Sequence, residues 1–250
     1  MKYKIILKTT HKHFLRIERC MKYWLKNQDV VCASDKIINL DIPQLSASDK
    51  DTHGVSSEEK TVYMFNHIKN NPSLYQEYDW FIFIDDDAIL NVNQLNYILP
   101  YLDKSKIYGI NMKGAYPKNI SLEYPSGGGG YLVSYNTIIN NDPMINHHHY
   151  HEDVSVGHYM RDNNLELSLI YIKDNKTHNV LMNGWFPLEY KNPELTRNNI
   201  VINDENLIAS LSENEIENLG NFLTHHYIVS DVLMEYIYNL FMKWKPSLLV

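Results

Sequence analysis

The sequence has few cysteines and no excess of basic residues, and each shortage excludes a class of protein. Two cysteines in 250 residues, Cys20 and Cys32, form neither a disulfide framework nor a zinc-ligand pattern. We therefore interpret both as core residues in a reducing compartment. The chain carries 23 Lys and Arg against 30 Asp and Glu, which gives a net charge of -7. This balance argues against a nucleic-acid surface and is compatible with a site that holds a cation.

Long hydrophobic runs are also absent from the sequence. No run approaches ~18 apolar residues, so we expect no transmembrane span. The apolar run at the start of the chain covers only Ile5–Leu7, so we expect no secretory signal and a cytoplasmic protein. The residues are 44% apolar and 21% charged, as in an ordinary globular protein. Because no linker or internal repeat divides the chain, we expect residues 1–250 to form a single domain.

The order of local patterns predicts an α/β fold with a mostly parallel sheet. A short β-prone run at Lys4–Leu7 precedes a helix over about residues 12–27, where apolar residues recur at three- and four-residue spacing. A second β-prone run, Asp29–Ala33, completes a βαβ unit, which favours parallel strands. Further strands are expected at 80–84, 106–111, 131–134 and 165–172, and loops at 41–57 and 112–125.

Three helix starts carry a sequence signal. Ser56–Glu59 and Ser212–Glu215 have the form of a capping box, in which a serine and a glutamate three residues later satisfy the first backbone donors. Ser230 has the form of an N-cap before a last apolar helix, which we interpret as core packing in preference to a membrane role.

The stretch Trp80–Asp87 is the most informative part of the chain. Trp80–Ile84 is apolar at every position, which suits a strand buried on both faces of a parallel sheet. Asp85, Asp86 and Asp87 follow directly, and three adjacent carboxylates repel one another unless a cation offsets their charge. In an extended chain Asp85 and Asp87 point one way and Asp86 the other. The pattern fits a metal and sugar site beyond the carboxyl end of a strand, and it also fits a solvated acidic turn.

Three further stretches each allow two interpretations. Gly127–Gly130 either lets the backbone approach a ligand closely or serves as a flexible linker. His147–His149 invites a metal interpretation, but three adjacent histidines cannot all face one ion, which favours a structural role. Glu152 and Asp153 lie at an expected helix start, where acids commonly serve only as partners of the helix dipole.

Four landmarks stand in order along the chain, and together they resemble a known family. They are Lys8-Thr9-Thr10, Asp85-Asp86-Asp87, the glycine cluster, and Glu152-Asp153-Val154 followed by Gly157. The order resembles the Fringe-like and β-1,3-galactosyltransferase-like glycosyltransferases of family GT31, which also have a later H-Y-V segment, matched here by His226-Tyr227-Ile228. The resemblance implies a GT-A glycosyltransferase fold, with a nucleotide-binding part at about 1–112 and an acceptor-binding part at about 113–250.

The resemblance also implies an activity and roles for individual residues. The activity is an inverting, metal-dependent transfer of a sugar (GlcNAc, Gal or Glc) from a UDP-sugar donor to a hydroxyl of a carbohydrate or glycoprotein acceptor, forming a β-1,3 linkage. Asp87 and His226 would hold Mn²⁺ or Mg²⁺, and Asp153 would be the catalytic base. The donor would be contacted by Thr9, Thr10, Asp35, Asp85, Asp86, Gly128 and Gly129.

For the catalytic base and for the metal-binding histidine, a neighbouring residue of similar chemistry is an alternative candidate. Consecutive helical side chains diverge by about 100°, so only one of Glu152 and Asp153 can face the donor. We expect Asp153 on the inward edge and Glu152 toward solvent or a backbone partner. His226 is expected at the metal in preference to His225 or the run at 147–149, the alternative being a satisfied core histidine.

Two rival functions use the same residues. A metal-dependent phosphohydrolase would employ the acids and histidines but gives no role to Lys8-Thr9-Thr10. A non-catalytic relative would only bind a nucleotide sugar or a carbohydrate.

Overall fold

The computed structural model describes residues 1–38, 40–50, 55–115, 121–147, 151–173, 178–180, 208–209, 211–226, 228 and 230–245. The helices are η1 (His11–His13), α1 (Phe14–Tyr23), α2 (Val55–Asn70), α3 (Pro72–Tyr75), α4 (Val92–Ile98), η2 (Leu99–Tyr101), α5 (Tyr135–Asn140), α6 (Glu152–Asp162), α10 (Glu213–Asn221) and α11 (Asp231–Lys243). The strands are β1 (Tyr3–Lys8), β2 (Val30–Ser34), β3 (Gln44–Ser46), β4 (Trp80–Asp85), β5 (Ile89–Leu90), β6 (Ile107–Gly109), β7 (Asn111–Ala115), β8 (Ser121–Pro125), β9 (Tyr131–Ser134), β10 (Leu167–Ser168), β11 (Tyr171–Lys173), β12 (His178–Val180) and β13 (Thr224–His225).

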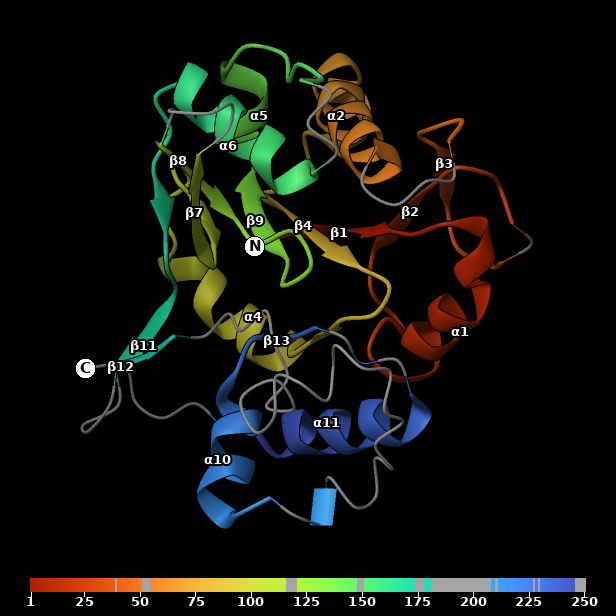
Figure 1. The fold of residues 1–250 in the computed structure, drawn as a ribbon, viewed down its shortest axis with the longest axis vertical. Coiled ribbons are helices and arrows are strands. Elements are labelled where there is room, and N and C mark those ends of the chain that lie inside the picture. The colour runs from red at the N-terminus through yellow and green to blue at the C-terminus, as the bar shows by residue number, and fades with distance from the viewer. Residues whose placement is uncertain are drawn as a thin grey trace.

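Seven strands form the central sheet, in the order β10-β6-β9-β4-β1-β2-β3 (Figure 1). β1 pairs in parallel with both β2 and β4, whereas β9 runs antiparallel to β4 and β6. The predicted α/β fold, with a mostly parallel sheet flanked by helices, is confirmed. β4 lies in the middle of this order, so the predicted central position of Trp80–Ile84 is confirmed as well.

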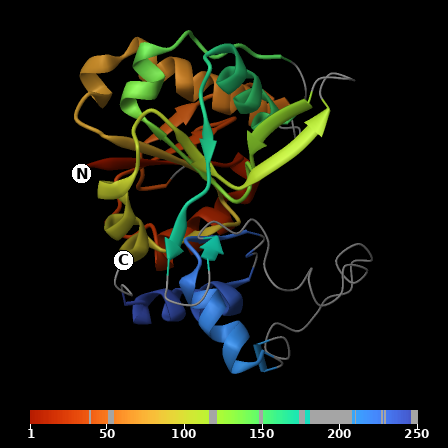
Figure 2. The same ribbon diagram turned by 90° about the vertical axis from the view of Figure 1, so that its left-hand side faces the viewer.

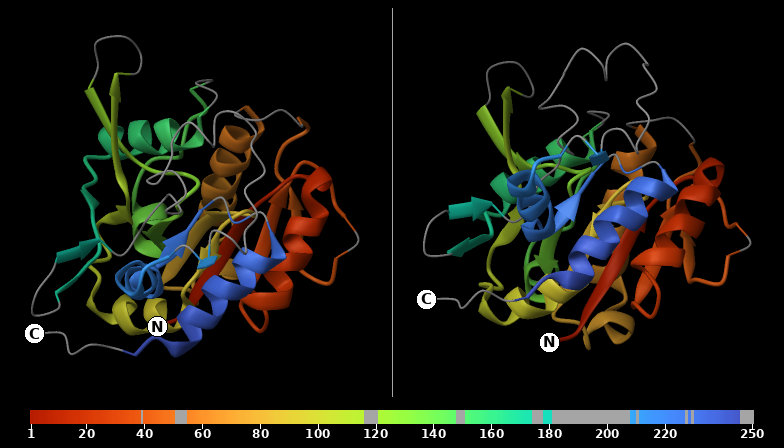
Figure 3. Two further views of the ribbon diagram at one scale, coloured as in Figure 1. Left: turned by 60° about the horizontal axis from the view of Figure 1, so that its bottom comes forward. Right: turned by 90° about the horizontal axis from the view of Figure 1, so that it is seen from below.

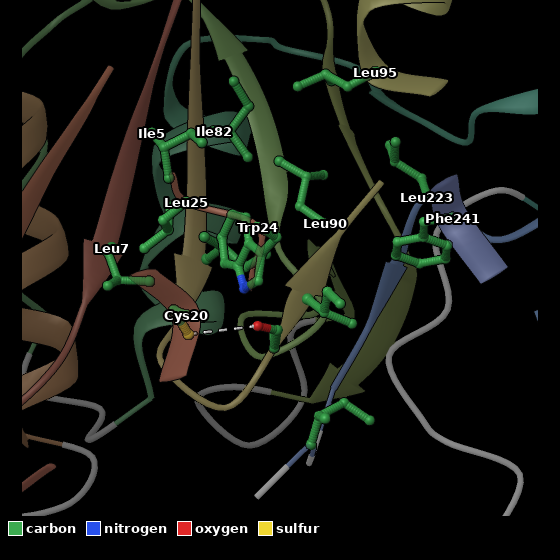
Figure 4. Packing of buried hydrophobic residues seen from close by; sticks show 14 of the residues in the cluster. Ile5, Leu7, Cys20, Trp24, Leu25, Ile82, Leu90, Leu95, Leu223 and Phe241 are labelled. Carbon is green, nitrogen blue, oxygen red and sulfur yellow. Dashed lines mark hydrogen bonds between the residues drawn. The ribbon is translucent and has the colours of Figure 1, made fainter. Parts of the chain in front are cut away.

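Alternate side chains of β4 enter two different cores. Ile82 and Ile84 pack on one face with residues of α4 and α11 and with residues in and next to α1 (Figure 4). Phe81 and Phe83 pack on the other face with residues of α2, α5 and α6, the three helices above the sheet in Figure 1. Burial on both faces explains why this strand is apolar at every position. Cys20 and Cys32 are both buried with free thiols, so their interpretation as core residues is confirmed.

Three local predictions were wrong. β3 lies within the loop expected at 41–57, and β7 and β8 form an antiparallel hairpin within the loop expected at 112–125. Figure 2 shows this hairpin extending away from the central sheet. α2 begins at Val55, so Ser56 lies inside the helix and does not cap it. In both sheet cases, pairing with a neighbouring strand overrides a weak local β-preference.

The capping predictions for the last two helices are confirmed. Ser212 and Glu215 form a complete capping box at the start of α10, and the Ser230 hydroxyl accepts the Leu233 N–H at the start of α11. α11 lies alongside α1 (Figure 3), where Arg19 Nε is 2.6 Å from Asp231 Oδ1. Among the helices that the structure describes, none is long and apolar enough to cross a membrane.

Candidate active site

The three adjacent aspartates follow the carboxyl end of β4, where they point in alternate directions as predicted. Asp85 is paired with Lys8 of β1, which lies directly opposite it in the sheet, at a distance of 3.0 Å between Lys8 Nζ and Asp85 Oδ1. Asp86 points toward η1 and α1 and accepts a hydrogen bond from the Thr9 hydroxyl at 2.6 Å. Parallel strands end at the same edge of a sheet, so β1 and β4 bring these side chains together.

Asp85 and Asp87 form a cluster with His226, which arrives from the other end of the chain. One ligand atom from each residue lies within 4.8 Å of the other two. His226 Nε2 is 3.0 Å from Asp87 Oδ1 and 4.0 Å from Asp85 Oδ2. This grouping, called the Asp85–Asp87–His226 cluster below, holds both predicted metal ligands and adds Asp85, which the sequence predicted as a donor contact.

The strand β13 places His226 in the cluster. β13 pairs antiparallel with β5, which follows the aspartates by a few residues, and the Ile228 N–H donates to the Asp87 carbonyl at 2.7 Å. Burial raises the pKa of Asp87, but the hydrogen bond from His226 and the charges of His226 and Arg16 outweigh it. The pKa of Asp87 therefore lies below its ordinary value, and the carboxylate is ionised at neutral pH.

The donor set of the cluster suits a hard divalent cation. Two carboxylates in close contact repel each other, and a cation between them offsets that repulsion. Carboxylate oxygens are typical ligands of Mg²⁺ and Mn²⁺, and an imidazole adds a neutral donor. The residues present therefore fit the metal that the resemblance implies.

The other histidines have different surroundings. His225 is fully buried, where its Nε2 contacts the Leu219 carbonyl at 2.9 Å, and burial lowers its pKa to about 4. The His147 N–H donates to the buried Glu58 carboxylate at 2.9 Å, which is a structural contact. His148, His149 and the neighbouring Tyr227 lie outside the described residues.

Glu152 is not where the helix argument placed it. Its side chain is buried, forms an ion pair with Lys8 and accepts a hydrogen bond from the Ser57 hydroxyl. The interpretation that Glu152 faces solvent or a backbone partner is therefore wrong. Lys8 lies between Asp85 and Glu152, so it links the Asp85–Asp87–His226 cluster to the start of α6.

Asp153, the predicted base, lies beside Glu152 in the first turn of α6 and is half-buried. Burial raises the pKa of Asp153, while the Val154 N–H and the charges of His151 and Lys8 act in the opposite direction. The net shift is upward. A carboxylate with a raised pKa binds a proton more readily, which is the property that a general base needs.

The glycine cluster forms a tight turn against the site. A Cβ atom on Gly128 would lie 2.0 Å from the His226 ring, and a Cβ atom on Gly127 would lie 2.3 Å from the Glu152 carboxylate. The Gly129 carbonyl accepts a hydrogen bond of 2.6 Å from the hydroxyl of Thr224, the first residue of β13. The linker interpretation is therefore wrong, because these glycines allow the backbone to pass close to two site residues.

The remaining predicted donor contacts surround the segment after β1. Thr10 caps η1 by accepting the Lys12 N–H, and Thr9 holds Asp86. Asp35 follows the end of β2 and is bound by His11, with an N–H to Oδ1 distance of 2.8 Å.

Sequence reasoning missed several residues of this region as members of the site. They are Lys8, His11, His13, Arg16 and Glu152. His13 and Arg16 both contact Asp86, at 3.1 Å and 3.2 Å. The signal for His11, His13 and Arg16 was the run of basic residues directly after Lys8-Thr9-Thr10.

No family model and no curated protein matches this chain, but solved structures do. One is a glycosyltransferase involved in the glycosylation of the major capsid of PBCV-1, with 12% identity and a TM-score of 0.43 over 96% of this chain and 99% of that one. The apo structure of the bifunctional glycosyltransferase WbbM has 10% identity and a TM-score of 0.50 over 95% of this chain and 50% of that one. The apo form of the glycosyltransferase GlyE of Streptococcus pneumoniae TIGR4 has 10% identity and a TM-score of 0.47 over 97% of this chain and 62% of that one.

This chain thus spans about half of the length of WbbM and less than two thirds of GlyE. At 10% identity the likeness to WbbM concerns the fold alone. The protein has the α/β fold of a GT-A-like glycosyltransferase, with the acidic cluster at the carboxyl end of its central strand.

Proposed function

We propose that this protein is a glycosyltransferase that moves a sugar from a UDP-sugar to a carbohydrate hydroxyl in a metal-dependent, inverting reaction. The observation that carries the proposal is the convergence of Asp85, Asp87 and His226 at the carboxyl end of the central strand. The order of motifs from Lys8 to Ile228, which resembles family GT31, supports the same activity and a β-1,3 linkage.

Asp85, Asp87 and His226 would hold Mn²⁺ or Mg²⁺. When bound, such an ion neutralises the negative charge that develops on the diphosphate as the sugar leaves. Lys8 keeps Asp85 oriented, and Arg16, 3.4 Å from Asp87 Oδ2, adds positive charge at the same edge.

Asp153 would act as the general base. It would take the proton of the acceptor hydroxyl as the hydroxyl oxygen attacks the anomeric carbon and the bond from that carbon to the UDP oxygen breaks. Attack opposite the leaving group inverts the anomeric centre, so an α-linked UDP-sugar gives a β-glycoside. Its raised pKa supports this role. Glu152 is already paired with Lys8 and is less suited to it.

The two parts of the chain would divide the substrates. Residues of about 1–112 would bind the donor nucleotide in the region around Thr9, Asp35 and Asp86, while about 113–250 would supply the base, the glycine turn and the acceptor surface. The acceptor would be a carbohydrate or a glycoprotein, and the transferred sugar GlcNAc, Gal or Glc.

Incubation with UDP-GlcNAc, UDP-Gal or UDP-Glc and MnCl2, with and without a panel of acceptor sugars, tests this function. We expect UDP release that requires the metal and increases with an acceptor. Asp87→Ala should abolish the release, whereas Asp162→Ala, which removes an exposed acid at the far end of α6, should not. Release of inorganic phosphate would indicate the phosphohydrolase, and binding without any release would indicate the non-catalytic relative; both results contradict the proposal.

A further inference from the structure

Asp35, the carboxylate expected near the uridine, is fully engaged by the protein itself. Its side chain is only 2% exposed. Oδ1 accepts the His11 N–H at 2.8 Å and the Ser34 hydroxyl at 3.1 Å, and Oδ2 contacts His11 Nδ1 at 2.5 Å. Burial raises the pKa of Asp35, but these hydrogen bonds outweigh it and lower the pKa to about 2. Asp35 is therefore an ionised carboxylate with both oxygens occupied.

This arrangement fixes the orientation and tautomer of His11. An ionised carboxylate can only accept hydrogen bonds, so Nδ1 of His11 carries the proton that Asp35 receives. In the neutral ring, Nε2 is then a hydrogen-bond acceptor. Among the described residues, the His11 ring is held by Asp35 through Nδ1. The His11 side chain is 28% exposed. The exposed polar group at this point is thus His11, with Asp35 behind it.

His11 lies at the same edge of the sheet as the Asp85–Asp87–His226 cluster. Ala33 of β2 and Asp85 of β4 both lie opposite Lys8 of β1, so Asp35 and Asp87 each lie two residues beyond a residue paired with Lys8. Neighbouring strands are about 4.8 Å apart, which separates the ends of β2 and β4 by about 10 Å. A nucleoside diphosphate carries its base at C1′ and its phosphates at C5′, which are opposite ends of the ribose. A donor with its phosphates at the cluster and its base over the end of β2 would span this separation.

We propose that His11, oriented by Asp35, selects the donor nucleobase by accepting a hydrogen bond from the imide N–H of uracil. The inference rests on the proposed function and deepens it. Uracil presents a ring N–H where cytosine presents an unprotonated nitrogen, so a cytosine would bring two acceptors face to face. Asp35 is a positioning residue, because it acts through His11.

Calorimetric titration of the protein with UDP and with CDP, in MnCl2 at pH 8, tests this assignment. We expect the wild-type protein to bind UDP roughly tenfold or more tightly than CDP, the effect of one hydrogen bond gained or left unsatisfied. His11→Ala should reduce this ratio to within about twofold. Asp35→Asn should also shrink it, because an amide permits the opposite tautomer of His11. Lys12→Ala, in the same turn of η1, should leave the ratio unchanged.

The outcomes separate this inference from the proposed function. Wild-type protein that binds neither UDP nor CDP contradicts the proposed function and removes the inference with it. Equal affinities for the two nucleotides in the wild type, or an unchanged ratio in His11→Ala, overturn the inference and leave the function standing. Thermal unfolding of each variant checks its fold, and the ratio measured for Asp35→Asn decides if His11→Ala does not fold.

Discussion

At the scale of single residues, each of the three adjacent aspartates has its own partners from elsewhere in the chain. The partners are Lys8 for Asp85, Thr9 and His13 for Asp86, and His226 for Asp87, while Arg16 contacts both Asp86 and Asp87. The sequence indicated that the acids need a cation, because adjacent carboxylates repel one another. It could not show that the protein supplies part of that charge, since long basic side chains reach the acids only after the strands have paired.

The same limit applies to the pair Glu152 and Asp153. Their positions at a helix start were predictable from the sequence, and α6 does begin at Glu152. The environment of Glu152 was not predictable, because it depends on Lys8 and Ser57 from distant elements. The rotation between consecutive helical residues predicts that Glu152 and Asp153 point in different directions. It does not predict which of the two side chains contacts another part of the protein.

Asp153→Asn should leave UDP and Mn²⁺ binding intact and lower the rate of transfer by ~10²–10⁴-fold, the usual contribution of a general base. The amide keeps the shape of the side chain but cannot take the proton of the acceptor. Steady-state transfer to the preferred acceptor, with UDP affinity measured by calorimetry, gives both quantities.

The matched variant is Glu152→Gln, which removes the charge that pairs with Lys8. It should lower the melting temperature more than the transfer rate, because breaking a buried ion pair is destabilising. Near-normal transfer by Asp153→Asn would remove Asp153 from the mechanism, and a larger rate loss in Glu152→Gln would reassign the base to Glu152.

At the scale of elements, the strands with continuous apolar runs were the most predictable. β1, β2 and β4 lie within a residue or two of their predicted positions, because burial on both faces leaves a direct trace in the sequence. β13 was not predicted, since it has only two residues and exists through its pairing with β5. Yet His226 directly follows β13, so the least predictable strand positions a central residue of the site.

The turn at Gly127–Gly130 is the element that accommodates His226. A Cβ atom on Gly128 would lie 2.0 Å from His226 Cε1, closer than any real contact. We expect Gly128→Ala to displace the His226 ring and to weaken Mn²⁺-dependent UDP binding by tenfold or more, roughly the loss of one good ligand contact.

Gly220→Ala provides the control for that variant. Gly220 lies in α10, and its added Cβ atom would meet Leu240 Cβ at 3.9 Å, an ordinary contact. Alanine is the better helix former by about 0.5–1 kcal/mol, so this variant should be as stable as the wild type or more so, with unchanged UDP affinity. If Gly128→Ala binds UDP and Mn²⁺ as tightly as Gly220→Ala does, the turn has no role in placing His226.

At the scale of the whole molecule, the site joins the two ends of the chain. Lys8 ends the first strand, β1, and His226 directly follows β13 near the other end of the chain, and both meet the carboxyl end of the central strand β4. The order of motifs in the sequence predicted which segments would meet, because parallel strands collect their carboxyl ends at one edge. A ligand that bridges these segments should therefore stabilise the entire fold, since it binds only when all of them are in place.

Thermal unfolding in the presence of UDP, with and without MnCl2, measures this coupling. At a ligand concentration 100-fold above Kd the stabilisation is about 2.7 kcal/mol, which corresponds to roughly 5–10 °C for a chain of this size. His226→Ala should lose most of this increase, because the cluster keeps only Asp85 and Asp87.

His225→Ala separates metal binding from core packing. His225 is fully buried and stacks on Phe241, with 5.7 Å between ring centroids, so its removal should lower the melting temperature with or without the metal. Because its ring points away from the cluster and toward the Leu219 carbonyl, the increase produced by MnCl2 should remain. The two neighbouring histidines should thus give opposite results, with His225→Ala less stable but still stabilised by the metal, and His226→Ala insensitive to it. An equal loss of the metal effect in both variants would leave the assignment of His226 as the ligand unsupported, because packing of the segment around β13 would then explain both losses.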